Sequence, residues 1–116
     1  MLTNLYKTIK RILIICYNIN MKKEQIIKLL QQKKQTLAKE YGIKSLGLFG
    51  SYSKGKQNKN SDIDILVEFN KSISLLKYLK LSNTLSKKTG KKIDLVMKSA
   101  LKKNIGKEIL KEVIYI

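Results

Sequence analysis

The chain has 116 residues, 43% of them apolar and 28% charged, and 25 basic against 8 acidic side chains give a net charge of +17. This length and balance predict one small soluble domain rather than a disordered segment. Because the sequence contains no His and only one Cys, it excludes zinc cages, disulfide frameworks, Ser-His-Asp triads and Cys-His dyads. The unpaired Cys16 favours a reducing, cytoplasmic location.

The positive charge comes almost entirely from lysine. Arg11 is the one arginine among the 25 basic residues, and the lysines are spread over nearly every segment. Surfaces that recognise phosphates or base edges favour arginine, because its guanidinium binds two oxygens at once. The pattern therefore indicates a solvated lysine surface. Binding to nucleic acid is not favoured, although the charge would attract it.

Residues 1–20 differ from the rest of the chain. They carry a few basic residues and a short apolar run, residues 12–17, which is too short to span a bilayer. We therefore expect no association with a membrane. Residues 1–20 are read either as an added N-terminal extension or as a non-native segment before a natural start at Met21, with the domain occupying residues 21–116.

From Lys22 onward, the periodicity of apolar residues predicts the elements in chain order. They are a helix from Lys22 to Gly42, a strand over Ile43–Phe49, a single helical turn over Ser51–Lys54, a polar loop over 55–61, a strand over Asp62–Phe69, a helix over Ser74–Lys88, a strand over Ile93–Met97, and a helix from Ser99 to about Ile114. The second long helix is expected to bury Leu75, Leu76, Leu79 and Leu85, and the last helix to have Ser99 as its N-cap. This order predicts an α+β fold, with a short mixed β-sheet packed with helices.

The most informative segment joins the first two strands. Gly50 and Ser51 form a turn behind the first strand, and Asp62 and Asp64 follow on the second. Residues i and i+2 of a strand point to the same side, so the two carboxylates lie together while the intervening isoleucine faces the other way. Two crowded carboxylates require a cation between them. A phosphate-binding turn facing a metal-binding pair predicts a site for a nucleoside triphosphate.

The third strand adds another carboxylate, Asp94, between two apolar residues. Taken alone, Asp94 reads equally well as an edge residue that faces water. Beside Asp62 and Asp64, it completes a set that can hold two Mg²⁺ ions, which prefer oxygen ligands and can bracket a phosphoryl displacement. The amides of Gly50 and Ser51, with the Ser51 hydroxyl, would bind the outer phosphates.

The run Gly50-Ser51, ten intervening residues, then Asp62-Ile63-Asp64 resembles the nucleotidyltransferase signature of the DNA polymerase beta superfamily. Within that superfamily, residues 22–116 resemble the minimal nucleotidyltransferases (MNT), which are encoded beside HEPN-domain toxins. The resemblance implies a small single-domain nucleotidyltransferase fold, ATP as substrate and Mg²⁺ as cofactor.

The resemblance also implies a role for each matching residue. Asp62 and Asp64 would bind both metal ions. Asp94 would bind the catalytic ion and help to deprotonate the attacking hydroxyl. Gly50 and Ser51 would bind the triphosphate, together with Lys54. Relatives often have arginines in the loop that here contains Tyr52 and Lys54, and a lysine keeps the charge but cannot bind two oxygens. Glu68 lies about 13 Å beyond Asp64 along the strand and is read as a surface residue or partner contact.

Little of the chain remains after the third strand, so we expect the second substrate to come from a partner protein. The resemblance implies an MNT antitoxin that transfers AMP from ATP to a hydroxyl of a cognate HEPN ribonuclease toxin, with tyrosine as the expected acceptor. One alternative is a non-enzymatic antitoxin that neutralises the toxin by binding alone. A weaker alternative, suggested by charge only, is an RNA-modifying or RNA-binding protein.

Overall fold

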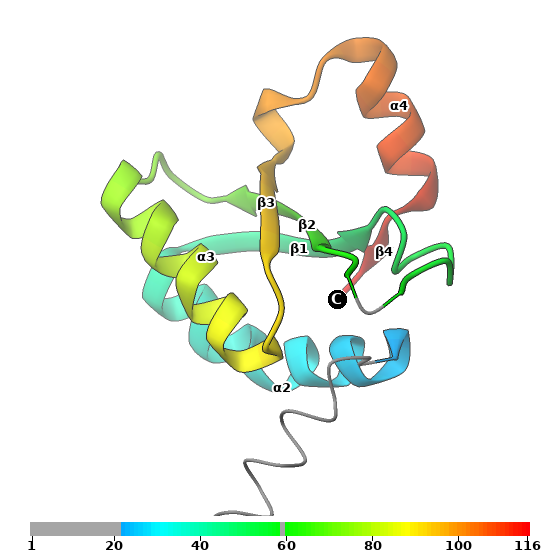
Figure 1. Ribbon diagram of the computed structural model, residues 1–116. Helices are drawn as coiled ribbons and strands as arrows, with labels where there is room; N and C mark the ends of the chain where they lie inside the picture. Colours follow the sequence, from blue (N-terminus) through cyan, green and yellow to red (C-terminus); the bar gives the residue numbers. More distant parts are fainter. Residues whose placement is uncertain (1–21, 59) are drawn as a thin grey trace, which may run out of the picture.

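The computed structural model describes residues 22–58 and 60–116, so the expectations for residues 1–20 and Met21 lie outside the described part. In chain order the elements are α2 (Lys23–Tyr41), β1 (Ile43–Phe49), β2 (Ile63–Phe69), α3 (Leu75–Thr89), β3 (Ile93–Met97), the 3₁₀ turn η2 (Lys98–Ala100), α4 (Lys103–Glu112) and β4 (Ile114–Tyr115). The strand order is β3-β2-β1-β4, with β2 and β3 parallel and the other pairs antiparallel (Figure 1). This mixed sheet with helices confirms the α+β prediction.

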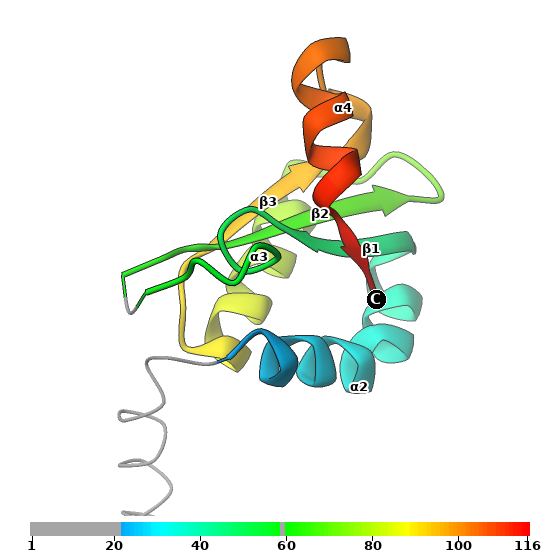
Figure 2. The same cartoon turned by 90° about the vertical axis from the view of Figure 1, so that its right-hand side faces the viewer.

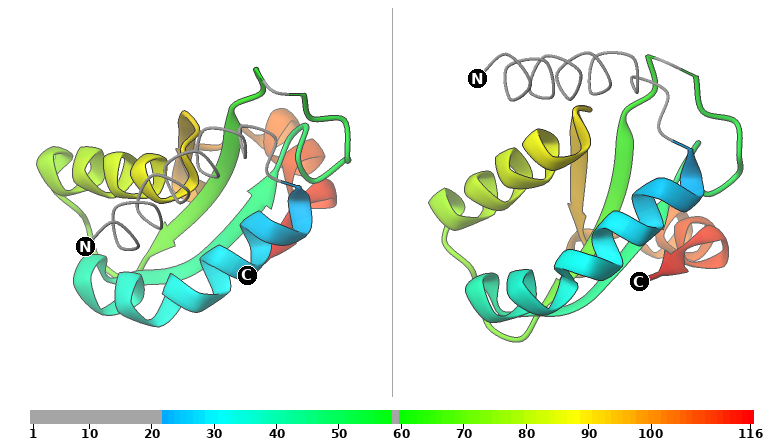
Figure 3. Two further views of the ribbon diagram at one scale, coloured as in Figure 1. Left: turned by 60° about the horizontal axis from the view of Figure 1, so that its bottom comes forward. Right: turned by 90° about the horizontal axis from the view of Figure 1, so that it is seen from below.

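Helices α2 and α3 cover one face of the sheet, and α4 stands on the opposite side (Figure 2). Seen from below, α2 lies along β1 and α3 lies beside β3 (Figure 3). Helix α2 buries Ile26, Leu30, Leu37 and Tyr41, which recur at helical spacing, and it ends at Gly42, whose positive φ of 69° makes the C-cap. No helix in the described residues is long and apolar enough to span a bilayer.

The central strand β2 fixes which side of the sheet carries the carboxylates. Its Ile63, Ile65 and Val67 are fully buried in the core beneath α2 and α3, as the alternation predicts. Each such side chain contributes about 1.5–3 kcal/mol when it is removed from water. A slip of one residue would expose all three and bury Asp62 and Asp64 instead. The core therefore holds the carboxylates on the opposite face.

The predicted buried stripe of α3 is wrong in its first half. Leu75, Leu76 and Leu79 are 72%, 81% and 49% exposed, whereas Leu85 is buried as predicted, together with Leu81. The helix contacts the core through Tyr78, Leu81 and Leu85, which recur at helical spacing on one side of it. Its first two turns therefore present leucines to solvent.

The C-terminal segment also differs from its prediction. Ser99 lies in η2 and does not cap a helix; α4 begins only at Lys103, and the chain re-enters the sheet as β4. Gly47 of β1 allows this approach, because a Cβ there would lie 2.7 Å from Cγ1 of Val113. The amide of Ile116 then donates to the carbonyl of Leu46 at 2.8 Å. The helix thus ends at Glu112, two residues before its predicted end, and Ile114 and Tyr115 form an edge strand.

Candidate active site

The predicted carboxylates meet at one end of the sheet, on the face opposite α2 and α3. Asp64 of β2 is directly paired with Phe49, the last residue of β1, on one side and with Asp94 of β3 on the other. Directly paired residues of neighbouring strands point to the same face, so the side chains of Asp64 and Asp94 are neighbours. Asp62 precedes β2 by one residue and is exposed. The structure therefore brings Asp64 and Asp94 together and leaves Asp62 at the rim.

Gly50 begins the turn that follows β1 and lies against Asp64. Its φ is +73°, and a Cβ there would lie 2.0 Å from Oδ2 of Asp64, so only glycine fits. The Gly50 carbonyl accepts from the amide of Lys54 at 3.2 Å and from the hydroxyl of Ser53 at 2.9 Å. The bond from residue 54 to residue 50 agrees with the predicted single helical turn. It places the turn beside the carboxylate pair.

Tyr52, which follows Ser51 in this turn, packs its side chain into the core. Its side chain is fully buried, burial raises the pKa of its hydroxyl, and that hydroxyl has no hydrogen-bond partner in the described part of the chain. Ser51 is half-buried, and its carbonyl accepts from the amide of Lys56 at 2.9 Å. Tyr52 therefore anchors the loop and, unlike an arginine, does not offer a positive charge to a phosphate.

The carboxylate of Asp64 lies in an unfavourable setting for a negative charge. Burial raises its pKa to about 6, with further contributions from the charge of Asp94, a hydrogen bond to Asp94, and the charges of Asp62 and Glu112. When Asp64 is protonated, its hydroxyl donates to the Asp94 carboxylate. Repulsion of this kind is what a bound cation relieves.

These residues suit a hard divalent cation, although they do not form a closed cage. Within residues 22–58 and 60–116, no group of three or more His, Cys, Asp or Glu side chains forms a ready-made metal cluster. The donors that do converge, Asp64 and Asp94, are carboxylates, which Mg²⁺ prefers. Asp62 is close enough for its charge to affect Asp64. Binding of metal by all three stays a prediction.

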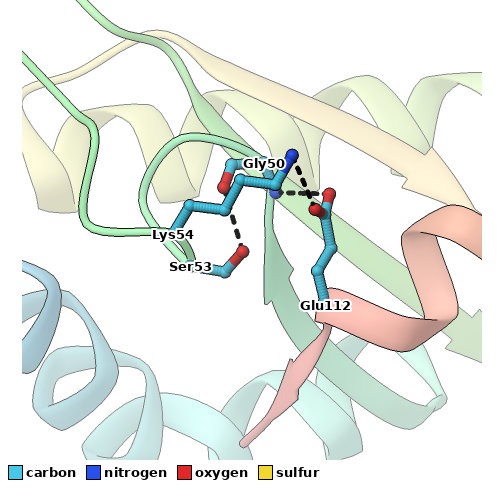
Figure 4. Close-up of polar contacts among 4 residues, drawn as sticks. All are labelled: Gly50, Ser53, Lys54 and Glu112. Atoms are coloured by element: carbon cyan, nitrogen blue, oxygen red, sulfur yellow. Dashed lines mark hydrogen bonds and ion pairs between the residues drawn. The ribbon is translucent and has the colours of Figure 1, made fainter.

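The structure places a further carboxylate, Glu112, at the phosphate-binding turn. Oε1 of Glu112 accepts from the amide of Gly50 at 3.3 Å, and Oε2 lies 3.0 Å from Nζ of Lys54 (Figure 4). Glu112 is not among the site residues predicted from the sequence. It is the last residue of α4, 62 positions from Gly50, so no spacing within a motif could reveal it.

Glu68 makes contacts within the chain. Oε1 of Glu68 accepts from the hydroxyl of Ser45 at 3.2 Å and lies 3.9 Å from Nζ of Lys98. Its side chain is 32% exposed. Glu68 is therefore a partly exposed residue held by neighbouring side chains, away from the Asp64 and Asp94 pair.

Comparison with known proteins decides the family. The model of the family described as "Nucleotidyltransferase domain" matches residues 24–116. The chain belongs to this nucleotidyltransferase family. The protein adenylyltransferase MntA of Thermococcus cleftensis is 43% identical over 93 residues, which cover 80% of this chain and 94% of the relative. A candidate protein adenylyltransferase of Methanocaldococcus jannaschii is 42% identical over 93 residues, covering 79% of this chain and 95% of that protein.

Solved structures share the fold of this nucleotidyltransferase. One named as a candidate minimal nucleotidyltransferase has a TM-score of 0.70 and 26% identity, covering 82% of this chain and 96% of the other. A toxin–antitoxin structure with AMP-PNP has a TM-score of 0.61 and 26% identity, covering 82% of this chain and 72% of the other. The fold is therefore the minimal nucleotidyltransferase fold that the sequence predicted.

Proposed function

We propose that this nucleotidyltransferase is an antitoxin that uses Mg²⁺ and transfers AMP from ATP to a tyrosine hydroxyl of a cognate HEPN ribonuclease toxin. The observation that carries the proposal is the carboxylate pair, Asp64 and Asp94, lying directly beside the Gly50 turn. The relative from Thermococcus cleftensis, named a protein adenylyltransferase, supports the reaction. The similar toxin–antitoxin structure with AMP-PNP supports both the nucleotide and the kind of partner.

The turn supplies the contacts for the triphosphate. Amides of Gly50 and Ser51 donate to phosphate oxygens, and Gly50 permits close approach because it has no side chain. The ammonium group of Lys54, which is 54% exposed, adds positive charge at the same place. These contacts orient the α-phosphorus toward the N-terminal ends of β2 and β3, where the carboxylates lie.

Asp94 is placed to act on the acceptor. It lies on β3, an edge strand of the sheet, and it is exposed, so a hydroxyl from another protein can reach it. Asp94 accepts the proton of the hydroxyl, whose oxygen forms a bond to the α-phosphorus while the bond to the bridging oxygen breaks and pyrophosphate leaves. Mg²⁺ held by Asp62, Asp64 and Asp94 would neutralise charge on the phosphates and the attacking oxygen.

The decisive experiment measures the mass of the partner. The full chain is incubated with Mg²⁺, ATP and the protein encoded by the neighbouring gene, and the partner is analysed by intact-mass spectrometry and peptide mapping. We expect one or more AMP additions on tyrosine. Asp62→Asn and Asp94→Asn should each reduce transfer by at least about 100-fold, because both remove a carboxylate from the reaction centre. Glu108→Gln, which neutralises an exposed carboxylate of α4, is the matched control and should leave transfer unchanged.

Other outcomes select the alternatives. If the partner stays unmodified but is inhibited in a stable complex, the protein is an antitoxin that acts by binding alone. Incorporation of labelled AMP into RNA ends instead of the partner would favour RNA modification. Transfer of AMP to serine or threonine would support the proposed enzymatic activity but show that the acceptor is not tyrosine.

A further inference from the structure

Glu112 occupies the position where the turn would bind an anion. One oxygen of its carboxylate accepts from the Gly50 amide and the other pairs with the Lys54 ammonium, at 3.3 and 3.0 Å (Figure 4). These are two of the donors that the proposed function assigns to the triphosphate. Two anions cannot use the same amide and ammonium without repelling one another. The Glu112 carboxylate must therefore leave this position when phosphates bind there.

The backbone of Glu112 is held between α4 and β4, whereas its side chain is partly exposed. Glu112 ends α4, and Val113, the next residue, packs where Gly47 has no side chain. β4 then pairs with β1. The side chains of Glu112 and Lys54 are 23% and 54% exposed, so water can replace each of their mutual contacts. Rotation of the Glu112 side chain alone would therefore open the turn, with α4 and β4 in place.

We propose that Glu112 is a built-in competitor of the triphosphate, which fills the phosphate-binding turn and sets the affinity for nucleotide. The inference rests on the proposed function, because it takes the Gly50 turn as the phosphate site. When a triphosphate displaces Glu112, the Gly50 amide and Lys54 ammonium bind phosphate oxygens instead. Because the competing carboxylate belongs to the chain, it weakens every ligand that uses the turn by the same factor, whatever its base or sugar.

The test uses inorganic tripolyphosphate, which has no base or sugar and cannot donate AMP. Its binding to the full chain is measured by isothermal titration calorimetry without divalent cations. Glu112→Gln keeps the size of the side chain and removes its charge, and it should bind tripolyphosphate about three to ten times more tightly than the wild type. Glu108→Gln removes an exposed charge from the same helix and should change the affinity by less than about twofold, as expected for a screened charge. In a Lys54→Met background the gain from Glu112→Gln should shrink, since one of the two shared donors is gone.

An equal or weaker affinity of Glu112→Gln would overturn the proposal, as would an equal gain from Glu108→Gln. Absence of measurable binding by both the wild type and Glu112→Gln would also overturn it. Glu112→Asp, whose carboxylate is one methylene farther from the turn, should tighten binding too and serves if Glu112→Gln does not fold. AMP transfer to the partner is assayed separately. If Glu112→Gln binds tripolyphosphate more tightly but the wild type transfers no AMP, the role of Glu112 as a competitor is supported and the proposed function is overturned. If AMP is transferred but Glu112→Gln binds no more tightly, the proposed function is supported and the role of Glu112 is overturned.

Discussion

The fold holds Asp64 in a position that is unfavourable for its negative charge. Its strand is fixed by buried isoleucines, and its side chain touches Gly50 and shares a hydrogen bond with Asp94. The pKa of its carboxyl is raised from 3.8 to about 6, first by burial and then by the charge of Asp94. The folded state therefore binds a proton at Asp64 more tightly than the unfolded chain does. This contribution to stability is complete below pH 3.8 and is lost as the pH rises to about 6.

Replacing this carboxyl should stabilise the apo protein at neutral pH. Without divalent cations, we expect Asp64→Asn to raise the free energy of unfolding by about 1 kcal/mol at pH 7.5, a figure reduced for partial exposure of the site. The gain should disappear at about pH 4, where Asp64 is protonated in the folded wild type. Urea unfolding at both pH values measures it, with Glu108→Gln as the control.

With Mg²⁺ added, we expect the wild type to be more stable than Asp64→Asn. The wild type gains stability by binding the ion in the folded state only, and Asp64→Asn gains less because it lacks one carboxylate. An Asp64→Asn protein that is less stable than the wild type at pH 7.5 without Mg²⁺ would show that the carboxylate contributes a favourable structural contact that outweighs its repulsion.

Also at the residue scale, the sequence revealed those site residues that a local pattern of the chain singles out. Alternation along a strand predicted one face for Asp62 and Asp64, and the lone carboxylate of an apolar strand drew attention to Asp94. Glu112 could not be found in this way. Its contact with Gly50 depends on the turn from α4 into β4, which in turn depends on the absence of a side chain at Gly47.

Among the elements, α3 shows what periodicity can and cannot predict. Its helical character follows from the sequence. In the structure its N-cap is Ser74, whose hydroxyl accepts from the amide of Lys77 at 3.2 Å, and its C-cap is Gly90. Which leucines are buried depends on how far the helix reaches across the sheet, and that length is a tertiary property. β4 is similar, since two residues of strand are too few for any period.

A pair of substitutions on α3 compares the contribution of a buried leucine to stability with that of an exposed one. Leu81→Ala should lower the free energy of unfolding by about 2–5 kcal/mol, because Leu81 is fully buried and leaves a cavity. Leu76→Ala makes the same chemical change at a side chain that is 81% exposed and should alter stability by less than about 0.5 kcal/mol. Urea or thermal unfolding of both variants gives the comparison. Similar losses for the two would mean that the first turns of α3 are packed in solution.

For the molecule as a whole, the dominant feature is its charge. With 25 basic and 8 acidic residues, most lysines have no carboxylate with which to pair, and the net charge of +17 acts on a chain of only 116 residues. Such an excess destabilises the compact state by repulsion and attracts any polyanion. The binding of nucleotides, of an acidic partner and of RNA is therefore favoured by the same field, so attraction alone does not identify the physiological ligand.

Screening this charge should stabilise the fold. Between about 0.01 M and about 1 M sodium chloride, the screening length falls from about 30 Å to about 3 Å. We expect the melting temperature to rise by at least about 4 °C, equivalent to about 1 kcal/mol for a domain of this size. A triple variant, Lys28→Glu, Lys80→Glu and Lys107→Glu, changes three exposed lysines and should melt higher at low salt and respond less to added salt. A melting temperature that falls with salt in both proteins would instead mean that attractive ion pairs, such as Lys54 with Glu112, outweigh the repulsion.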